Sequence, residues 1–250
     1  MATARTSRKP PSRRNTAELT GRSSRAIEPQ AREPSIVDLI VRKLQEEIVL
    51  GRRHPRERLV EQDLCVAFDT HRGDVRLALF ELEKMGIVER IPNRGAIVRD
   101  LKPRDVRDIY AVREELEVMA VNILPFPVPD ADIARLEAIQ HAHGKAVDAG
   151  DLLAVFHNNV QFHRALFGLC GNTCLIETIE HLAQKASGIR SYAHAMPEAL
   201  NDARRDHVAM IKALHSSRRD HLVDLTRRHL KPAVLAYVNA YRLRFGEADA

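Results

Sequence analysis

The sequence of 250 residues predicts a mainly α-helical protein, with a small helix-and-hairpin part first and an all-helical bundle after it. Three observations favour this class. Apolar residues recur at helical spacing over most of the chain, strand patterns are confined to residues 87–99, and the breaks beyond residue 101 are short. The length allows one large domain or two ordinary ones.

The composition is that of a soluble globular protein, because 44% of the residues are hydrophobic. No apolar run approaches the roughly 20 residues that a membrane-spanning helix needs, so no membrane partner is expected. The basic N-terminus lacks the apolar stretch of a secretory signal. Cys65, Cys170 and Cys174 are odd in number and form no CxxC pair. These features exclude a disulfide scaffold and predict a cytoplasmic location.

Residues 1–33 form a predicted disordered basic tail, since they are rich in Arg, Ser, Pro and Thr and poor in apolar residues. The tail holds eight of the 39 basic and three of the 34 acidic residues, which leaves 31 of each sign elsewhere. The excess of positive charge therefore lies in the tail. It is either a plain leader or an arm that adds non-specific phosphate contacts.

Residues 34–101 are predicted to form a winged helix-turn-helix. Helical spacing covers residues 36–50, and two shorter helices follow at about 60–68 and 72–84. Residues 87–91 and 96–99 alternate like strands, and the turn 92–95 joins them. A short helix, a tight turn, a second helix and a hairpin, in this order, are typical of a DNA-reading unit.

The third helix carries the candidate base-reading side chains. Arg72 and Arg76 lie four residues apart on one face. Each can donate two parallel hydrogen bonds to the O6 and N7 atoms of a guanine. His71 at the start of this helix could reach a base or a phosphate, and Gln62 of the preceding helix could contact the DNA backbone.

The hairpin tip provides the candidate wing contacts. Arg94 could reach the minor groove or the backbone, and Gly95 permits the turn and a close approach to a phosphate. The alternative interpretation is a solvated charged helix followed by an ordinary hairpin.

Residues 102–246 are predicted to form a bundle of six or seven helices, because the helical segments are long and their connections short. The predicted helices span residues 104–123, 130–149, 151–169, 173–195, 197–216 and 219–245.

Four side chains of this bundle form a candidate metal site. Asn159 and His163 share one helical face. His207 and His229 each lie 11 residues from Arg218, at the turn between their helices, so an antiparallel hairpin places them level. Three imidazoles and an amide oxygen could thus meet at one ion. Charged helix faces also produce such spacings by chance.

Residues 36–100 resemble the N-terminal domain of the GntR family of bacterial transcription factors. The motifs that carry the resemblance read ERLVE from Glu57, HRGDVRLAL from His71 and GIVERIPNRGA from Gly86. The resemblance implies that Arg72 and Arg76 read DNA. The sequence departs from the family at the turn glycine, which is Asp69, and at Ser-x-Thr-Pro, which reads His71-Arg72-Gly73-Asp74. Asp74 is expected to place a negative charge beside the DNA.

Residues 103–243 resemble the FCD ligand-binding domain of FadR-type GntR regulators, through NVQFHRAL from Asn159, then GN, and HVAMIKA from His207. The resemblance implies a divalent metal, zinc or else nickel or manganese, bound by Asn159, His163, His207 and His229. Asn159 replaces an Asp that is frequent in the family, and its amide is a weaker ligand.

An ion with open positions would accept a small carboxylate effector. Arg113 matches the family's R-x-x-L-E helix and could pair with that carboxylate. The alternative role for Arg113 is a structural salt bridge to a glutamate.

Together these features predict a homodimeric regulator, most simply a repressor, that binds double-stranded operator DNA and senses a small organic acid. The rival class is a metal-dependent hydrolase, in which three histidines activate water. Such an enzyme also needs a carboxylate base. Glu117 is a candidate, whereas Asp206 neighbours His207 and is expected to point to another face. A DNA-reading unit makes catalysis unnecessary, so no enzyme is expected.

Overall fold

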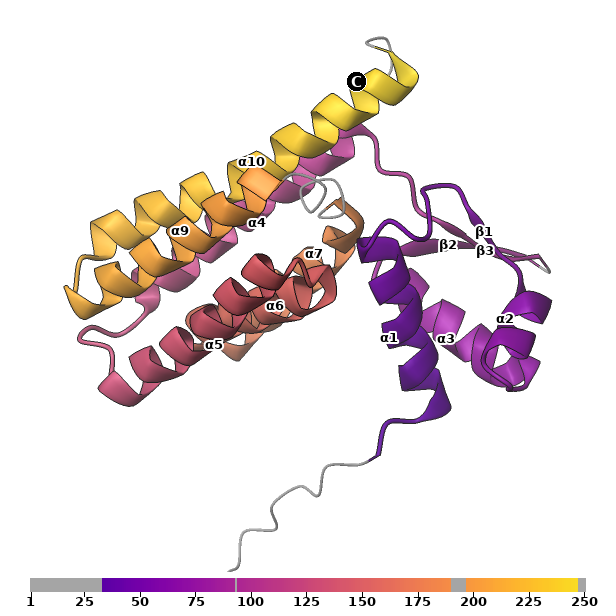
Figure 1. The fold of residues 1–250 in the computed structure, drawn as a ribbon, viewed down its shortest axis with the longest axis horizontal. Coiled ribbons are helices and arrows are strands. Elements are labelled where there is room, and N and C mark those ends of the chain that lie inside the picture. The colour runs from indigo at the N-terminus through magenta and orange to yellow at the C-terminus, as the bar shows by residue number, and fades with distance from the viewer. Residues whose placement is uncertain (1–32, 93, 190–196, 247–250) are drawn as a thin grey trace, which may run out of the picture. The chain divides into compact units, whose positions relative to one another are not determined.

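The computed structural model describes residues 33–92, 94–189 and 197–246, and its fold is mainly α, as the sequence predicts (Figure 1). Apart from Glu33, the predicted basic tail lies outside the described residues. The first part of the chain contains three helices and three strands, in this order: α1 (Ile36–Val49), β1 (Arg58–Leu59), α2 (Glu61–Ala67), α3 (Arg72–Lys84), β2 (Val88–Ile91) and β3 (Gly95–Val98).

Helix α1 begins at a capping box. The Ser35 hydroxyl accepts a hydrogen bond from the Asp38 backbone N–H, and the Asp38 carboxylate accepts one from the Ser35 N–H. This exchange satisfies backbone donors that a helix start leaves open. The buried face of α1, from Ile40 to Ile48, then packs with Leu79 and Leu82 of α3 in one apolar core.

The sheet has the strand order β1-β3-β2, and both pairs are antiparallel. The sequence did not predict β1, because two residues carry no recognisable alternation. Leu59 pairs with Ala96 of β3, and this pairing brings the Leu59 carbonyl close to Gly95. Gly95 has a φ of +94°, and a Cβ built there would lie 2.2 Å from the Leu59 oxygen. Position 95 therefore requires glycine for reasons internal to the fold.

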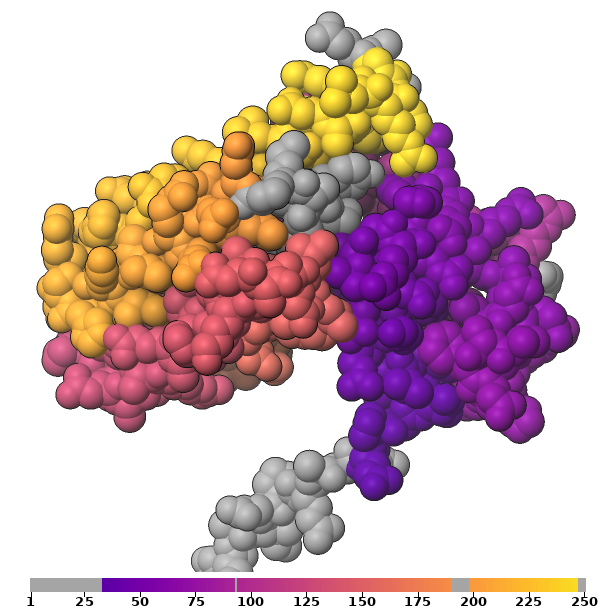
Figure 2. Space-filling model, in the orientation of Figure 1, coloured from indigo at the N-terminus to yellow at the C-terminus, as the bar shows by residue number. Residues whose placement is uncertain are grey.

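The second part of the chain contains helices and no strand among its described residues. It contains α4 (Pro103–Ile123), α5 (Asp130–Ala149), α6 (Leu152–Gly168), α7 (Thr173–Lys185), the 3-10 turn η1 (Ser187–Ile189), α9 (Pro197–His215) and α10 (Arg219–Phe245). Figure 1 shows α4, α9 and α10 lying along one another, with α5, α6 and α7 as a second layer. In the space-filling view, α9 and α10 run side by side in orange and yellow (Figure 2).

The predicted breaks coincide with caps. Gly150 ends α5 with a φ of +67°, and the Asp151 carboxylate accepts from the Ala154 N–H at the start of α6. The Asn172 side chain caps α7 in the same way.

One predicted helix was too long. The helix expected over residues 173–195 ends at Lys185 in the structure. Ser187 and Gly188 follow in a 3-10 turn, and both are weak helix formers. Residues 190–196 lie outside the described part of the chain.

The core of the bundle lies between the two layers. Its largest fully buried side chains include Phe162 and Leu166 of α6, Met210 and Leu214 of α9, and Leu136 of α5. Burial of such a side chain contributes about 1.5–3 kcal/mol. This apolar packing fixes the position of α6, α9 and α10 along one another, and so determines which of their polar residues lie at the same level.

We expect Gly95→Ala to destabilise the N-terminal part by about 2 kcal/mol or more, since the new Cβ meets the Leu59 carbonyl and the backbone angle is left-handed. Thermal or urea denaturation measures the change. Gly73→Ala is the matched control, because Gly73 is helical and a Cβ there has nothing within 4 Å. It should be neutral or stabilising. Equal effects of the two changes would contradict the assignment.

Candidate functional site

Helix α3 turns one face to the core and the other to solvent. Val75, Leu79 and Leu82 are buried, while Arg72 and Arg76 are exposed. The predicted division of this helix into an apolar and a basic face is therefore confirmed. An exposed arginine pair on the second helix of a helix-turn-helix can enter a major groove.

Both arginines are held by residues of α2. The Arg72 Nη2 donates to the Gln62 side-chain oxygen at 2.9 Å. The Arg76 Nε lies 3.1 and 3.0 Å from the two carboxylate oxygens of Glu61. Gln62 thus lies beside the predicted reading residues. Glu61 was not among the predicted site residues, and its spacing of 15 residues from Arg76 gives no sequence signal.

The departures from the family motif have local structural explanations. Asp69 occupies the turn with a φ of +46°, a conformation that Asp tolerates better than most residues. His71 is the N-cap position of α3 without a side-chain capping bond, and it is exposed. Asp74 accepts a 2.7 Å hydrogen bond from the Thr70 hydroxyl. This bond holds the Asp74 carboxylate beside the first turn of α3, where a negative charge also interacts favourably with the helix dipole.

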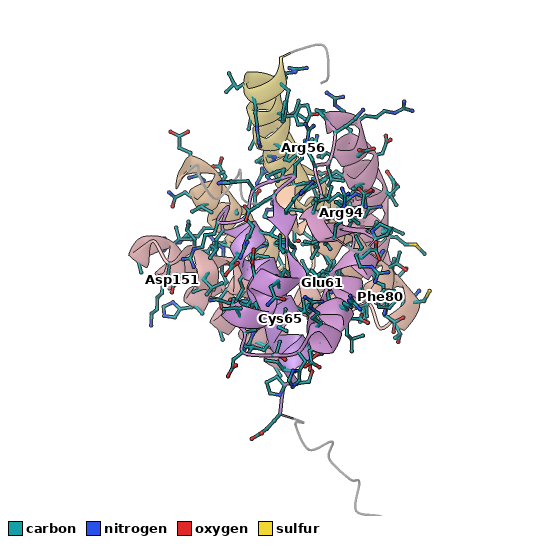
Figure 3. All side chains as sticks on the ribbon, turned by 90° about the vertical axis from the view of Figure 1, so that its right-hand side faces the viewer. Arg56, Glu61, Cys65, Phe80, Arg94 and Asp151 are labelled. Carbon is teal, nitrogen blue, oxygen red and sulfur yellow. The ribbon has the colours of Figure 1, made fainter. Side chains whose placement is uncertain are left out.

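The hairpin carries Arg94 at its exposed tip, whereas Gly95 is buried. Figure 3 looks onto the end of the domain where Glu61, Phe80 and Arg94 face the viewer. Arg94 is thus available as a wing contact. Gly95 is explained by its approach to β1, and a phosphate contact at its backbone stays a prediction.

The three predicted histidines of the bundle converge. One ligand nitrogen from each of His163, His207 and His229 lies within 4.8 Å of the others. The Nε2 atoms of His163 and His229 are 3.1 Å apart, and the rings of His207 and His229 have centroids 4.8 Å apart. The count of 11 residues on each side of the α9–α10 turn therefore predicted their level placement correctly.

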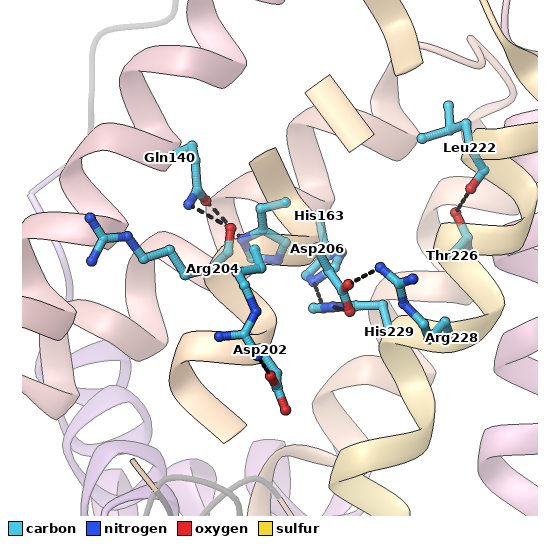
Figure 4. A network of polar contacts seen from close by, with 11 residues as sticks. Gln140, His163, Asp202, Arg204, Asp206, Leu222, Thr226, Arg228 and His229 are labelled. Atoms are coloured by element: carbon cyan, nitrogen blue, oxygen red, sulfur yellow. Dashed lines mark hydrogen bonds and ion pairs between the residues drawn. The ribbon is translucent and has the colours of Figure 1, made fainter. Parts of the chain in front are cut away.

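Two polar residues orient these rings from behind. The Gln140 side-chain nitrogen donates to the Arg204 carbonyl at 3.3 Å, so its oxygen is the atom that faces the His207 Nδ1 at 2.9 Å. Asp206 places a carboxylate oxygen 3.4 Å from the His229 Nδ1 (Figure 4). Both contacts place a proton on Nδ1. The Nε2 lone pairs of both rings are then directed to the centre of the cluster.

Asp206 was expected to point to another face than His207, and it reaches the histidine cluster through His229 of α10 instead. It contacts both His229 and Arg228 (Figure 4). Burial by itself would raise the pKa of Asp206, but hydrogen bonds from His229 and Arg228 outweigh burial and lower the pKa. Asp206 is therefore an ionised partner of a histidine at neutral pH. Spacing on one helix could not reveal a contact that arrives from α10.

A cavity adjoins the cluster, with about 80 Å³ of space for the centre of a water molecule. At about 10–15 Å³ for each water, it has room for several water molecules. Its walls are mostly apolar, with a few polar groups among them. The lining residues that bear on function are Tyr110, Arg113, His143, Asn159, His163 and His229. Asn159 thus shares a cavity with two of the predicted ligands.

Arg113 forms the salt bridge that was one of the two roles the sequence left open, and its role in effector binding stays a prediction. Its Nη2 lies 2.8 Å from the Glu117 carboxylate, and both side chains are buried. Burial opposes the charge, but Glu117 and Tyr110 raise the pKa of Arg113 above its ordinary value. The salt bridge to a glutamate is therefore present, and Arg113 also lines the cavity. The Glu117 carboxylate accepts hydrogen bonds from the Arg113 Nε and Nη2.

His143 was missed by the sequence reasoning. It is 1% exposed, its Nδ1 has no hydrogen-bond partner among the described residues, and it lines the cavity. Burial, followed by the nearby charges of His229 and Arg204, lowers the pKa of His143 to about 4, so the ring is neutral at physiological pH. His141 and His143 both lie on α5, and helical periodicity alone did not say which one faces inward.

Among the residues that the structure describes, no helix is both long and apolar enough to cross a bilayer. Two family descriptions match the chain. Residues 37–98 match bacterial regulatory proteins of the gntR family, and residues 108–232 match the FCD domain. The second match alone spans half of the chain.

The relatives are transcriptional regulators rather than enzymes, which confirms the prediction against catalysis. The regulator McbR of Escherichia coli K12 is 26% identical over 66% of this chain and 74% of its own length. The repressor RspR of the same strain is 26% identical over 63% of this chain and 70% of its own. YdhC of Bacillus subtilis, an uncharacterized HTH-type transcriptional regulator, is 28% identical over 56% of this chain, and the match spans 63% of YdhC.

Solved structures show the same fold. The structure of E. coli McbR/YncC matches 83% of this chain and 99% of its own with a TM-score of 0.73 at 20% identity. A GntR regulator from Rhodococcus sp. RHA1 matches 82% of this chain and 99% of its own with a TM-score of 0.67 at 24% identity. With a winged helix-turn-helix before an FCD domain, the chain belongs to the GntR family of transcriptional regulators, in its FadR-type group.

Proposed function

We propose that this regulator is a homodimeric repressor that binds operator DNA through α3 and the hairpin and releases it in response to a small organic acid. In this proposal Gln62, His71, Arg72, Arg76, Arg94 and Gly95 contact DNA, and residues 34–101 and 102–246 are the reading and sensing domains. The observation that carries the sensing role is the convergence of His163, His207 and His229 beside a small cavity.

A divalent metal suits the cluster. Two nitrogens bound to one tetrahedral zinc at about 2.0–2.1 Å lie roughly 3.3 Å apart, and the Nε2 atoms of His163 and His229 lie 3.1 Å apart. Gln140 and Asp206 orient the rings of His207 and His229 as metal-binding proteins orient their imidazoles. Asn159 would supply the fourth ligand, and zinc, nickel or manganese would fit such a nitrogen-rich set.

The effector would occupy the adjoining cavity. Its volume favours a molecule with few non-hydrogen atoms. A carboxylate would bind an open position on the metal or the remaining N–H groups of Arg113. The buried Nδ1 of His143, which has no hydrogen-bond partner in the described part of the chain, would bind a second polar group of the effector. A ligand that satisfies this nitrogen recovers the cost of its burial.

Dimerisation follows from paired half-sites, which two copies related by a two-fold axis read together. The exposed face of α4 carries Val112, Met119 and Ile123, which are 51%, 49% and 44% exposed. Their spacing of seven and four residues places them in one apolar stripe. A second copy of the chain would cover this stripe, and effector binding would shift the balance between arrangements of the two reading domains.

The metal proposal predicts that Asn159→Asp raises zinc affinity, because a carboxylate is a stronger ligand than an amide. Zinc affinity is measured by competition with a chromogenic chelator, and native mass spectrometry of the purified protein reports metal content, dimer mass and any retained acid. Asn158→Asp is the matched control, since Asn158 bonds the Ala154 carbonyl instead. Equal zinc affinities in the two variants would show that Asn159 is not a ligand. A wild-type protein that binds no zinc, nickel or manganese would refute the whole metal site.

The effector role of His143 makes a stability prediction for the protein stripped of metal by EDTA. His143→Leu should be neutral or stabilising, because it removes a buried nitrogen without a partner. Gln140→Leu is the contrasting variant on the same helix. It should cost about 1–3 kcal/mol, because the His207 Nδ1 then loses its acceptor. Urea denaturation measures the free energy of unfolding of both variants. A loss in His143→Leu as large as that in Gln140→Leu would show that His143 stabilises the fold and would contradict its effector role.

The DNA proposal predicts that Arg72→Ala with Arg76→Ala weakens specific binding by at least about 100-fold, since each bidentate contact to guanine is worth roughly 1–3 kcal/mol. The probe is a duplex that the wild-type protein selects from a random library, and fluorescence anisotropy measures affinity. Arg104→Ala is the control, because it removes one charge at an exposed position outside the reading domain. Unchanged binding by the double variant would refute the recognition-helix assignment.

A further inference from the structure

A hollow lies between α3 and the hairpin, and two arginine–carboxylate pairs are among the residues that line it. Its polar lining is Glu61 with Arg76 and Glu83 with Arg90, and Leu79, Ile91, Pro92 and Gly95 complete it. In both pairs the arginine Nε is the atom that meets the carboxylate. Glu61 lies on the surface that is proposed to bind DNA, where its carboxylate would repel the phosphates. A benefit in another respect is therefore expected from this residue.

The Glu61–Arg76 contact holds one edge of the guanidinium. The Arg76 Nε lies 3.0–3.1 Å from both carboxylate oxygens. The side chain of Glu61 is 20% exposed and that of Arg76 is 58% exposed. The carboxylate is therefore the sheltered partner, at the first residue of α2, and the arginine projects past it toward solvent. This contact restricts how the long side chain of Arg76 can turn.

The anchored edge decides which N–H groups can read a base. A guanidinium can offer a guanine either Nε with one Nη, or both Nη groups together. Because Glu61 occupies Nε, only the two Nη groups remain for the O6 and N7 atoms. Arg72 differs, since its neutral partner Gln62 takes Nη2. The two arginines of α3 are thus held at different nitrogens, Arg72 at Nη2 and Arg76 at Nε.

We infer that Glu61 is a positioning residue for DNA recognition, which directs the Nη edge of Arg76 toward one base pair and opposes binding to DNA that lacks it. This inference rests on the proposed reading role of Arg76. The carboxylate repels phosphates wherever the protein binds, so it weakens specific and non-specific complexes alike. The orientation of Arg76 strengthens only the complex with the correct base pair. The ratio of the specific to the non-specific DNA affinity therefore rises.

The charge and the orientation can be separated by substitution. Glu61→Gln removes the charge but keeps an oxygen that can accept from the Arg76 Nε. Glu61→Ala removes both. Glu81→Gln is the matched control, because Glu81 lies on another face of α3, where it forms a comparable ion pair with Lys84 at 2.9 Å. Arg76→Ala identifies the base pair that Arg76 reads.

The experiment measures the affinity of the full-length protein for the library-selected duplex, for the duplexes carrying each single base-pair change, and for a scrambled duplex of equal length. Glu61→Gln should raise affinity for the scrambled duplex by about two- to three-fold and retain discrimination at every base pair. Glu61→Ala should raise it similarly and lose about ten-fold discrimination at the base pair identified by Arg76→Ala. Glu81→Gln should show neither base-specific loss nor a comparable gain.

Two outcomes overturn the inference, and they are distinguishable. If Arg76→Ala loses discrimination at one base pair while Glu61→Ala retains it, Glu61 does not position Arg76 and the reading role of Arg76 stands. If Arg76→Ala alters no base preference, the assignment of Arg76 fails and the inference fails with it. Circular dichroism and a thermal melt of each variant confirm folding, and Glu61→Gln provides the test of charge should Glu61→Ala melt early.

Discussion

The antiparallel packing of α9 against α10 is the constraint on which the helical domain depends. His207 and His229 are 22 positions apart in sequence, and they meet because both helices leave the same turn and pack through buried side chains such as Met210 and Leu225. A slide of one helical turn moves a residue by about 5.4 Å, which exceeds the present 4.8 Å between the two ring centroids. Apolar contacts thus determine the geometry of a polar site.

In the N-terminal part of the chain and in the helical bundle alike, a polar partner fixes the orientation of a planar side chain. In the bundle, Gln140 and Asp206 hold the Nδ1 edge of an imidazole, so that Nε2 points to the centre of the cluster. In the N-terminal part, Glu61 of α2 holds the Nε edge of the Arg76 guanidinium on α3, so that its two Nη groups remain for a ligand. In each case an anchored edge removes rotational freedom before a ligand arrives, which lowers the entropic cost of binding.

Burial gives these contacts different weights. Gln140, Asp206 and His207 are all more than nine-tenths buried, so loss of a partner there leaves a polar group that water does not reach. Glu61 and Arg76 lie at the surface, where an ion pair contributes little to stability. We therefore interpret the surface pair as a device for orientation and specificity, and the buried pairs as requirements of the folded domain.

The sequence by itself determined the class of fold, most element boundaries and the three converging histidines. These features follow from helical periodicity, from caps such as Ser35 and Asn172, and from counting residues to a turn. Each of these signals lies within a short segment of the chain or follows from counting residues along it. It also supported membership of the GntR family, because the motifs occur in register with the elements they require.

Only the tertiary structure decided which side chains of neighbouring elements meet. The strand β1 exists because its two residues pair with β3, and Asp206 faces His229 because α10 crosses beside α9. The inward position of His143 and the Glu61–Arg76 pair are likewise contacts between elements. Periodicity assigns a residue to a face of its own helix. The partner across that face is set by the packing of other helices, which no local pattern contains.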